Sequence, residues 1–234
     1  MISETRGYHY VAVIPAYNEA ATIRDVASRT LEQLPELIVV EDGSLDATAA
    51  ALDGLPLALL RNPVNMGKSA SLWQGMQQAL ERGAQAVITL DGDGQHRPEE
   101  IPALIAAHRR RPEAIIIGSR LHRRTGMPAA RYYANRLANF WVSFFAGYRI
   151  PDSQSGFRIY PAELLRRVRV RHDASARFTL ESEILIEAGR MGIRSVAVPI
   201  MVSYRELPRT SHYAPIADSY RIGCMFVRKW LRLR

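Results

Sequence analysis

Short apolar runs alternate with longer amphipathic segments through the first half of the chain. Five runs of four or five residues are almost wholly apolar, which is typical of strands buried on both faces. They cover residues 10–14, 37–40, 57–60, 86–90 and 114–117. Helical spacing between them predicts helices at 20–34 and 69–82 and a third that begins at Pro98. This alternation predicts an α/β fold with a mainly parallel, doubly covered sheet.

Polar segments follow all five predicted strands. They cover residues 15–19, 41–44, 62–68, 91–96 and 118–120. Ligands of open parallel sheets bind beyond the carboxyl ends of the strands, and those ends meet along one edge. We therefore expect these five segments to come together and to form the functional site.

Two carboxylates, Asp91 and Asp93, follow the fourth predicted strand and are separated by one glycine. Mg²⁺ or Mn²⁺ takes one or two protein carboxylates, and diphosphate oxygens and water complete its shell. Gln95 would add a neutral oxygen or orient a metal-bound water. A tight turn would use Asp and Gly in the same pattern for their backbone conformations. The neighbouring polar strand ends favour the metal site over the turn alone.

Asp42 ends the second predicted strand, where its carboxylate would accept hydrogen bonds from a nucleobase or a ribose. The next helix needs a cap, and Ser44 or Asp46 would supply it. Both roles are compatible, because different residues perform them. We therefore assign Asp42 to the ligand.

Residues 62–69 differ from a phosphate-binding P-loop at one position, since Asn62 stands where that loop has glycine. A P-loop NTPase is therefore an alternative class of protein. The missing glycine and the position of the segment after the third strand disfavour it. In either class we expect Lys68, or the helix end beside it, to lie near a diphosphate.

Charge differs between the two halves of the chain, whose net charge is +8. Residues 1–117 hold 10 basic and 15 acidic side chains, a net of −5, and residues 118–234 hold 21 and 8, a net of +13. Such an excess predicts an anionic partner for the second half. Nucleic acid is the least favoured such partner, because no nucleic-acid motif is present and the acidic edge of residues 15–95 would repel phosphates.

Aromatic residues lie between arginines in residues 131–149, and residues 214–234 have the pattern of a basic amphipathic helix. Both patterns are typical of segments in a bilayer interface, although helices packed on the protein's own core or on a partner subunit would share them. No apolar run approaches the roughly 18 residues that span a bilayer. We therefore expect peripheral binding to a membrane surface, directly or through a membrane-protein partner. One cysteine and no signal peptide predict a cytoplasmic protein, at the cytoplasmic face of the membrane.

Six motifs occur in order along the chain. They are PAYNE at 15–19, EDGS at 41–44, NMGK at 65–68, DGDGQH at 91–96, GSR at 118–120 and QSGFR at 154–158. Together they resemble the inverting glycosyltransferases of family 2, which have the GT-A fold, and within them the dolichyl-phosphate mannose synthase and polyprenyl-phosphate glycosyltransferase branch. The resemblance implies a catalytic domain of residues 1–213, with a nucleotide-sugar and metal half at 1–120 and an acceptor half at 121–213. The amphipathic helix of residues 214–234 would follow it.

The resemblance also implies a role for individual residues. The donor would be a nucleotide-diphosphate sugar, a GDP- or UDP-hexose, whose base and ribose are held by Pro15, Tyr17, Glu19 and Asp42. Its metal and diphosphate site would consist of Asp91, Asp93 and Gln95. The donor and acceptor phosphates would meet Arg120, Arg131, Arg209, Ser211 and His212. The last three belong to a late motif that differs from the usual one of the synthases, which leaves the choice of donor and acceptor open.

These assignments predict a metal-dependent transfer of a hexose to a polyprenyl phosphate or another membrane-associated acceptor, with Asp93, Asp152 and Arg120 nearest the chemistry. A lipid phosphate is already anionic and needs no base, so arginines would orient it through bidentate hydrogen bonds. A hydroxyl acceptor would need a base, for which Asp152 is the candidate. The alternative to a role as base is that Asp152 is a loop carboxylate paired with an arginine such as Arg158.

Overall fold

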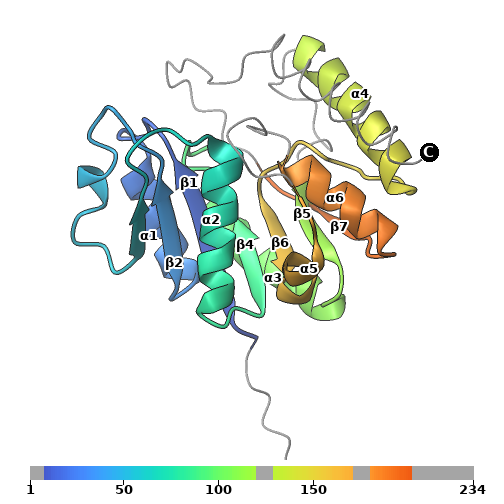
Figure 1. Cartoon of the computed structure of the whole chain (residues 1–234), viewed down its shortest axis with the longest axis horizontal. Coiled ribbons are helices and arrows are strands. Elements are labelled where there is room, and N and C mark those ends of the chain that lie inside the picture. Colours follow the sequence, from blue (N-terminus) through green and yellow to red (C-terminus); the bar gives the residue numbers. More distant parts are fainter. Residues whose placement is uncertain (1–7, 120–128, 171–179, 202–234) are drawn as a thin grey trace, which may run out of the picture.

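The computed structural model describes residues 8–119, 129–170 and 180–201, with only the backbone in residues 129–134. Its framework is a seven-stranded sheet (Figure 1). Across the sheet the strands follow the order β3, β2, β1, β4, β6, β5, β7. Their bounds are β1 (Tyr10–Ala16), β2 (Leu37–Glu41), β3 (Ala58–Arg61), β4 (Ala86–Thr89), β5 (Ile115–Ser119), β6 (Arg158–Pro161) and β7 (Ser195–Pro199).

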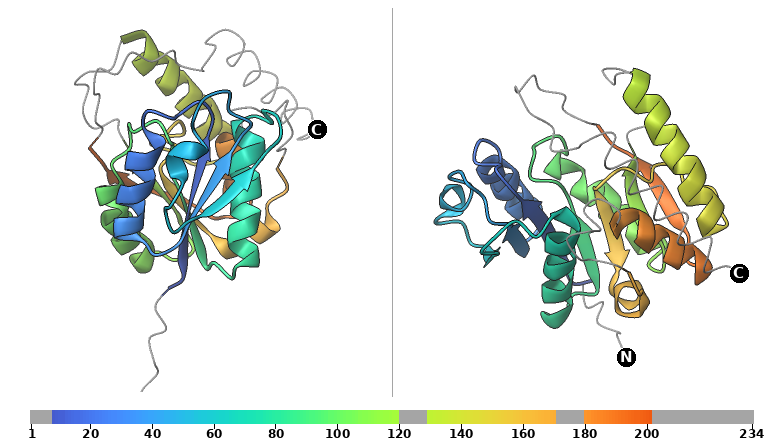
Figure 2. Two further views of the ribbon diagram at one scale, coloured as in Figure 1. Left: turned by 90° about the vertical axis from the view of Figure 1, so that its left-hand side faces the viewer. Right: turned by 45° about the horizontal axis from the view of Figure 1, so that its top comes forward.

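Helices cover both faces of this sheet, as the alternating pattern predicts. The α-helices are α1 (Ile23–Gln33), α2 (Lys68–Glu81), α3 (Ile101–Arg110), α4 (Ala129–Ala146), α5 (Ala162–Arg167) and α6 (Leu180–Arg190), and two 3-10 helices are η1 (Ala50–Leu52) and η2 (Pro98–Glu100). Figure 2 shows α1 and α2 on opposite faces of the sheet. Helix α4 packs against α6. In the part of the chain that is described, no helix has the length and apolarity to cross a membrane.

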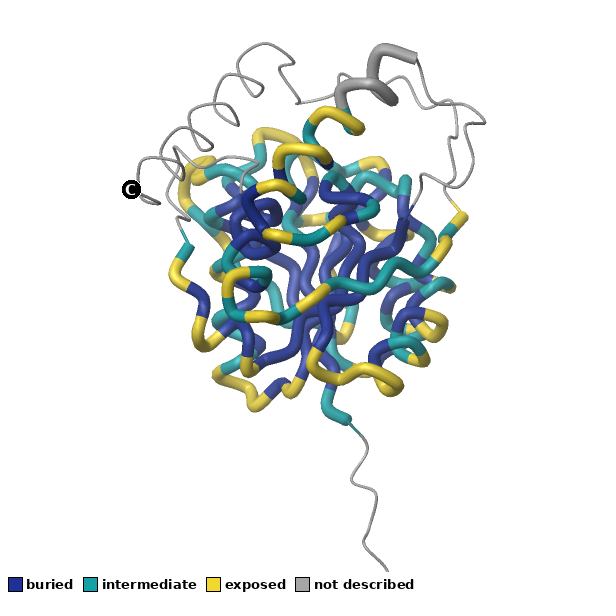
Figure 3. The backbone as a smooth tube through the Cα atoms, turned by 90° about the vertical axis from the view of Figure 1, so that its right-hand side faces the viewer, coloured by how far each residue is buried: buried dark blue, intermediate teal, exposed yellow. Residues whose placement is uncertain are grey.

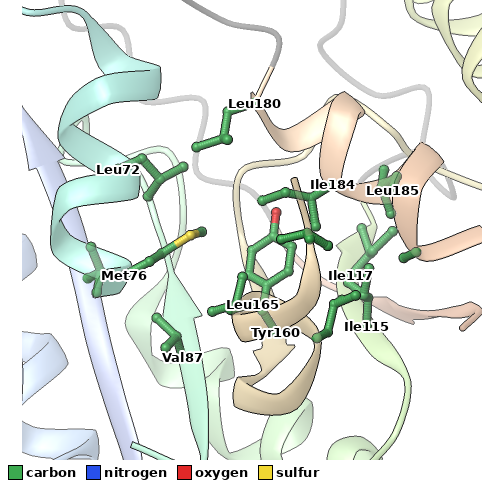
Figure 4. Close-up of a cluster of buried hydrophobic side chains, with 14 of the residues drawn as sticks. Leu72, Met76, Val87, Ile115, Ile117, Tyr160, Leu165, Leu180, Ile184 and Leu185 are labelled. Carbon is green, nitrogen blue, oxygen red and sulfur yellow. The ribbon is translucent and has the colours of Figure 1, made fainter. Parts of the chain in front are cut away.

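Two hydrophobic cores lie on the two faces of the sheet, because successive residues of a strand point to opposite sides. In β1, Val11 and Val13 face the core that α2, α5 and α6 cover, and Ala12 and Ile14 face the core that α1 and α3 cover. Figure 3 shows the buried strands at the centre of the molecule, and Figure 4 shows Tyr160 of β6 within the first core. Each fully buried large apolar side chain stabilises such a core by about 1.5–3 kcal/mol.

The sheet is parallel except for β6, which runs antiparallel to β4 and to β5. Arg158, the first residue of β6, pairs with Thr89 near the end of β4. The chain therefore enters β6 at the edge where the other strands end, and residues 150–157 lie at that edge. All five predicted strands are confirmed with bounds shifted by at most two residues, and the mainly parallel sheet is confirmed with them.

Candidate active site

The loops after β1 and β2 are fastened to each other at the carboxyl edge of the sheet. Ser44 Oγ accepts a hydrogen bond from the N–H of Asn18 at 3.0 Å, and the N–H of Leu45 donates to Asn18 Oδ1 at 2.8 Å. Asn18 has a φ of 53°, a left-handed conformation that asparagine tolerates. Thr48 Oγ1 accepts from the N–H of Glu19 at 2.8 Å. These bonds hold the two segments that we expect to bind the base and the ribose side by side.

Asp46 strengthens the same contact between loops. Its Oδ1 accepts hydrogen bonds from the N–H and the hydroxyl of Thr48, and its Oδ2 accepts from the N–H of Ala20 at 3.2 Å. Burial by itself raises the pKa of Asp46, but the hydrogen bonds to the charged form outweigh it, and the pKa lies below its ordinary value. Asp46 therefore caps the turn ahead of η1. The Ser44 hydroxyl instead accepts the hydrogen bond from the N–H of Asn18.

Asp42 is buried, and its carboxylate holds the loop between β3 and α2. Its Oδ1 accepts hydrogen bonds from Asn62 Nδ2 at 2.8 Å and from the N–H of Met66 at 2.9 Å, and its Oδ2 accepts from the N–H of Gly67 at 2.8 Å. A carboxylate has about four lone-pair positions, so one remains for a ligand. The loop amides are turned toward Asp42, whereas a P-loop would direct them toward phosphate. This arrangement disfavours the NTPase alternative.

Lys68, the first residue of α2, lies between two carboxylates. Its Nζ is 2.7 Å from Asp91 Oδ1 and 3.1 Å from Glu181 Oε1. Burial by itself lowers the pKa of Lys68, but the two carboxylates outweigh it, and the pKa lies above its ordinary value. The ammonium is therefore charged at the edge where the sequence places a diphosphate.

Asp91 and Asp93 form a tight turn that also presents their oxygens. Asp93 Oδ1 accepts a hydrogen bond from the N–H of Gln95 at 2.9 Å, and Gly94 has a φ of 71°. The hydroxyl of Thr22 donates to the Gly92 carbonyl at 2.8 Å and ties the turn to the start of α1. The turn and the metal site that the sequence left as alternatives are therefore compatible in this geometry.

Gly156 leaves room for the carboxylate of Asp91. A Cβ at Gly156 would lie 2.8 Å from Asp91 Oδ2 and 3.0 Å from Oδ1. Among the described residues, no group of three or more His, Cys, Asp or Glu side chains gathers as a metal site. Two carboxylates are enough for Mg²⁺ or Mn²⁺, which keep waters and bind through one or two carboxylates plus substrate phosphates. Asp91 and Asp93 are thus the residues that would hold such a cation.

The loop of residues 150–157 is organised by two buried side chains. Arg158 is fully buried and donates to the carbonyls of Ser153, Ser155 and Glu181 and to the hydroxyl of Tyr160. Within the described part of the chain, these four hydrogen bonds do not include Asp152, so the pairing with Arg158 that the sequence left open does not form there. Asp152 is 1% exposed, and its Oδ1 accepts from the N–H of Gln154 at 3.2 Å.

Asn139 of α4 fastens the same loop from outside the sheet. Its Oδ1 accepts hydrogen bonds from the N–H and the hydroxyl of Ser153, at 2.8 and 2.7 Å. Its Nδ2 donates to the Pro151 carbonyl at 3.0 Å. Helix α4 therefore supports the loop that carries Gly156 to Asp91.

The structure brings most of the predicted donor-site residues to one edge. Pro15 lies opposite Val40 in the β1–β2 ladder, and Tyr17 and Glu19 follow it in the loop that meets the β2 loop. Five of the residues predicted to bind phosphate lie outside the described side chains. They are Arg120, Arg131, Arg209, Ser211 and His212. The predicted helix of residues 214–234 also lies outside the described residues.

Sequence reasoning missed three contributors to this edge. Glu181 is 90 positions from Asp91 and lies in a helix, so nothing local marks it. His96 is buried, and its Nδ1 accepts from the N–H of Asp91 at 3.3 Å. Gly156 stands in the QSGFR motif, which could have drawn attention to it, but only the fold reveals its contact with Asp91.

Comparison with known proteins defines the class first. A crystal structure of glucosyl-3-phosphoglycerate synthase from Mycobacterium tuberculosis with Mn²⁺, UDP and glucosyl-3-phosphoglycerate superposes with a TM-score of 0.69. It covers 97% of this chain and 80% of that chain at 18% identity, a similarity that establishes the fold. The GT-A fold that the motifs imply is thereby confirmed.

The family follows from the sequence model of Glycosyl transferase family 2, which matches residues 11–170. The chain belongs to this family. The undecaprenyl-phosphate mannosyltransferase of Micrococcus luteus is 28% identical over 207 residues, or 84% of each chain. The UDP-N-acetylglucosamine–dolichyl-phosphate N-acetylglucosaminyltransferase of Methanococcus voltae is 28% identical over 215 residues, or 83% of this chain and 85% of the relative. The resemblance to the polyprenyl-phosphate branch is confirmed with the family.

Proposed function

We propose that this glycosyltransferase moves a hexose from a nucleotide-diphosphate sugar to a polyprenyl phosphate, with Mg²⁺ or Mn²⁺ as cofactor. The observation that carries the proposal is the cluster of Asp91, Asp93 and Lys68 at the carboxyl edge of the sheet. The two relatives differ in the sugar that their names give, but both names specify a polyprenyl phosphate acceptor. That shared acceptor supports a lipid phosphate for this chain.

The donor would lie along the edge from β2 to β4. The remaining lone pair of Asp42 would accept a hydrogen bond from the base or the ribose, beside Pro15, Tyr17 and Glu19. Asp91 and Asp93 would hold the cation, with Gln95 beside them. When bound there, the cation supplies Lewis-acid stabilisation of the diphosphate leaving group. The ammonium of Lys68 adds a preorganised positive charge next to it.

The acceptor would approach from the side of α4 and the loop of residues 150–157. Its phosphate oxygen is already anionic, so the chain needs to orient it and not to deprotonate it. We assign this role to Arg120 and Arg131, and we assign the late motif of Arg209, Ser211 and His212 to the donor diphosphate. The burial of Asp152 favours a role in positioning the loop over contact with a hydroxyl acceptor. A lipid phosphate is therefore the favoured acceptor.

Helix α4 supports the approach of a membrane-bound acceptor. Its residues Leu137, Phe140, Trp141 and Phe144 are 60%, 59%, 40% and 62% exposed. Their spacing of three, one and three places them on one face of the helix. We propose that this face contacts the cytoplasmic surface of the membrane, with a membrane-protein partner as the alternative occupant. The substrate lipid would then be presented next to the loop of residues 150–157.

Transfer to a lipid phosphate tests the proposal directly. We expect label from GDP- or UDP-hexose to pass to undecaprenyl phosphate in the presence of Mn²⁺, and EDTA to abolish the transfer. Asp91→Asn and Asp93→Asn should each lower the rate by roughly 10²–10³-fold, the size typical of a lost electrostatic contact in a transition state. The matched control is Asp53→Asn, because Asp53 is an exposed carboxylate in the connection between η1 and β3. Equal rates for all three variants would refute the metal site.

A further inference from the structure

Lys68 has two carboxylate partners that come from different parts of the chain. Asp91 follows β4, and Glu181 lies in the first turn of α6. Among the described residues, Lys68 forms ion pairs with these two and with no other. The ammonium therefore bridges the two halves of the domain.

Glu181 has a fixed position beside Lys68, because its side chain is mostly buried and its backbone is hydrogen-bonded. Its side chain is 10% exposed, and its backbone carbonyl accepts a hydrogen bond from Arg158 at 2.8 Å. Arg158 is itself fully buried and fixed by three further hydrogen bonds. The Glu181 backbone keeps this contact whatever the charge of its side chain.

Lys68 and a divalent cation compete for the same carboxylate. Lys68 Nζ lies 2.7 Å from Asp91 Oδ1, and Asp91 is the residue that we expect to hold the cation. Two cations at one carboxylate repel each other. The repulsion is stronger at a partly buried site, because the effective dielectric constant there is lower than in water. A second acceptor for the ammonium lowers the cost of releasing Asp91.

We propose that Glu181 is a positioning residue that draws Lys68 away from Asp91 and keeps it at the site when Asp91 binds the divalent cation. This inference rests on the proposed function. Glu181 acts through Lys68, because its carboxylate contacts the ammonium and its effect on Asp91 is indirect. The ammonium that Glu181 retains then lies beside the diphosphate.

The inference predicts opposite signs for two substitutions. Lys68→Met removes the competing cation and should tighten the binding of Mn²⁺ alone by roughly three- to tenfold. Glu181→Gln leaves Lys68 bound to Asp91 only and should weaken the binding of Mn²⁺ by a similar factor. In the double variant the effect of Glu181→Gln should shrink to about twofold or less, because the residue through which it acts is gone.

Binding of Mn²⁺ to the full chain, measured by electron paramagnetic resonance of the free ion, gives these affinities without an activity assay. Arg82→Met and Glu187→Gln are matched controls, since they remove one charge of each sign, at the C-cap of α2 and farther along α6. Glu181→Asp withdraws the carboxylate from Lys68 but keeps its charge, and it should also weaken Mn²⁺ binding. This variant serves as a second test if Glu181→Gln does not fold, which thermal unfolding reveals.

Two outcomes overturn the inference in distinguishable ways. If Lys68→Met and Glu181→Gln both weaken binding, or if Glu181→Gln keeps its full effect in the double variant, Glu181 is a structural residue only. The proposed function then survives. If the wild-type chain binds no Mn²⁺ at millimolar concentration, alone or with GDP or UDP, the metal-dependent function fails together with the inference.

Discussion

Asp42, Asp91 and Lys68 are each held by other groups of the protein before a ligand binds. Asp42 receives three hydrogen bonds from the loop before α2, and Lys68 bridges Asp91 and Glu181. Buried polar groups of this kind are costly unless they are paired. The pairing explains how charged side chains remain fixed at the end of an apolar sheet, where they are already oriented for a diphosphate.

Gly156→Ala tests the fit of the turn at Asp91. The new methyl group would lie 2.8 Å from Asp91 Oδ2, so the carboxylate must move out of its position. We expect nucleotide binding in the presence of Mn²⁺ to weaken by roughly tenfold, about 1.4 kcal/mol. Calorimetric titration measures this, and thermal unfolding checks that the fold is kept. Unchanged affinity in a folded variant would show that the close contact has no part in binding.

Asp46→Ala tests the cap between the first two loops. At pH 7 we expect a loss of about 0.5–1 kcal/mol in the free energy of unfolding, a low value because Asp46 is exposed. The folded pKa lies below the unfolded value near 3.8, so the stabilisation is present above that value and is lost as the pH falls through the folded pKa. Urea unfolding of both proteins should differ at pH 7 and converge as the pH falls through the folded pKa of Asp46. A difference that persists in acid would assign the effect to packing.

At the scale of elements, α4 has two contrasting faces. Val142, Phe145 and Ala146 belong to the same core as the buried residues of α6. Gly189 of α6 permits the close approach of the two helices, since a Cβ there would lie 2.3 Å from the Ala146 carbonyl oxygen. The other face carries the exposed apolar residues beginning at Leu137. An exposed apolar face of this kind is typical of an interaction surface. The helix also holds the loop of residues 150–157 through Asn139.

The double substitution Phe140→Ser and Phe144→Ser tests the membrane contact of that face. Both side chains are exposed, so the loss of folding stability should be small. We expect sedimentation with anionic lipid vesicles to fall by at least about fivefold, because two apolar anchors are lost. Leu45→Ser is the matched control, since Leu45 is 88% exposed but lies in the loop after β2. Equal loss in the control, or none in the double variant, would contradict a membrane role for α4.

At the scale of the whole molecule, one antiparallel strand completes the site. Strand β6 starts at the edge where β4 ends, and the loop before it places Gly156 against Asp91. Helix α6 then contributes Glu181 from the far side of Lys68. The site is thus assembled from segments between residues 15 and 181, and its integrity is tied to the global fold.

Ligand-induced stabilisation of the whole chain follows from this assembly. A nucleoside diphosphate at 100 times its Kd should add about 2.7 kcal/mol to the free energy of unfolding. For a chain of this length that raises the midpoint of thermal unfolding by roughly 5–11 °C. We expect the shift with GDP or UDP, and only when Mn²⁺ or Mg²⁺ is present. A shift with ATP alone would favour an NTPase instead.

The sequence by itself determined the local elements and the chemistry at the strand ends. Apolar runs predicted the first five strands because burial on both faces requires continuous apolar residues. The carboxylates Asp91 and Asp93 and the six motifs then indicated the donor site and the family. Strand β6 escaped the same reasoning, since Pro161 and the charged Arg158 leave only two other residues and no continuous apolar run.

Only the tertiary structure decided which distant residues meet at the site. The contacts of Lys68 with Glu181, of Gly156 with Asp91 and of Asn139 with Ser153 join residues that are far apart along the chain. Local propensity and periodicity report on neighbours along a helix or strand, and they carry no information on such pairs. The partner of a buried charge is fixed by the packing of sheet and helices, because the packing decides which oxygens lie within reach.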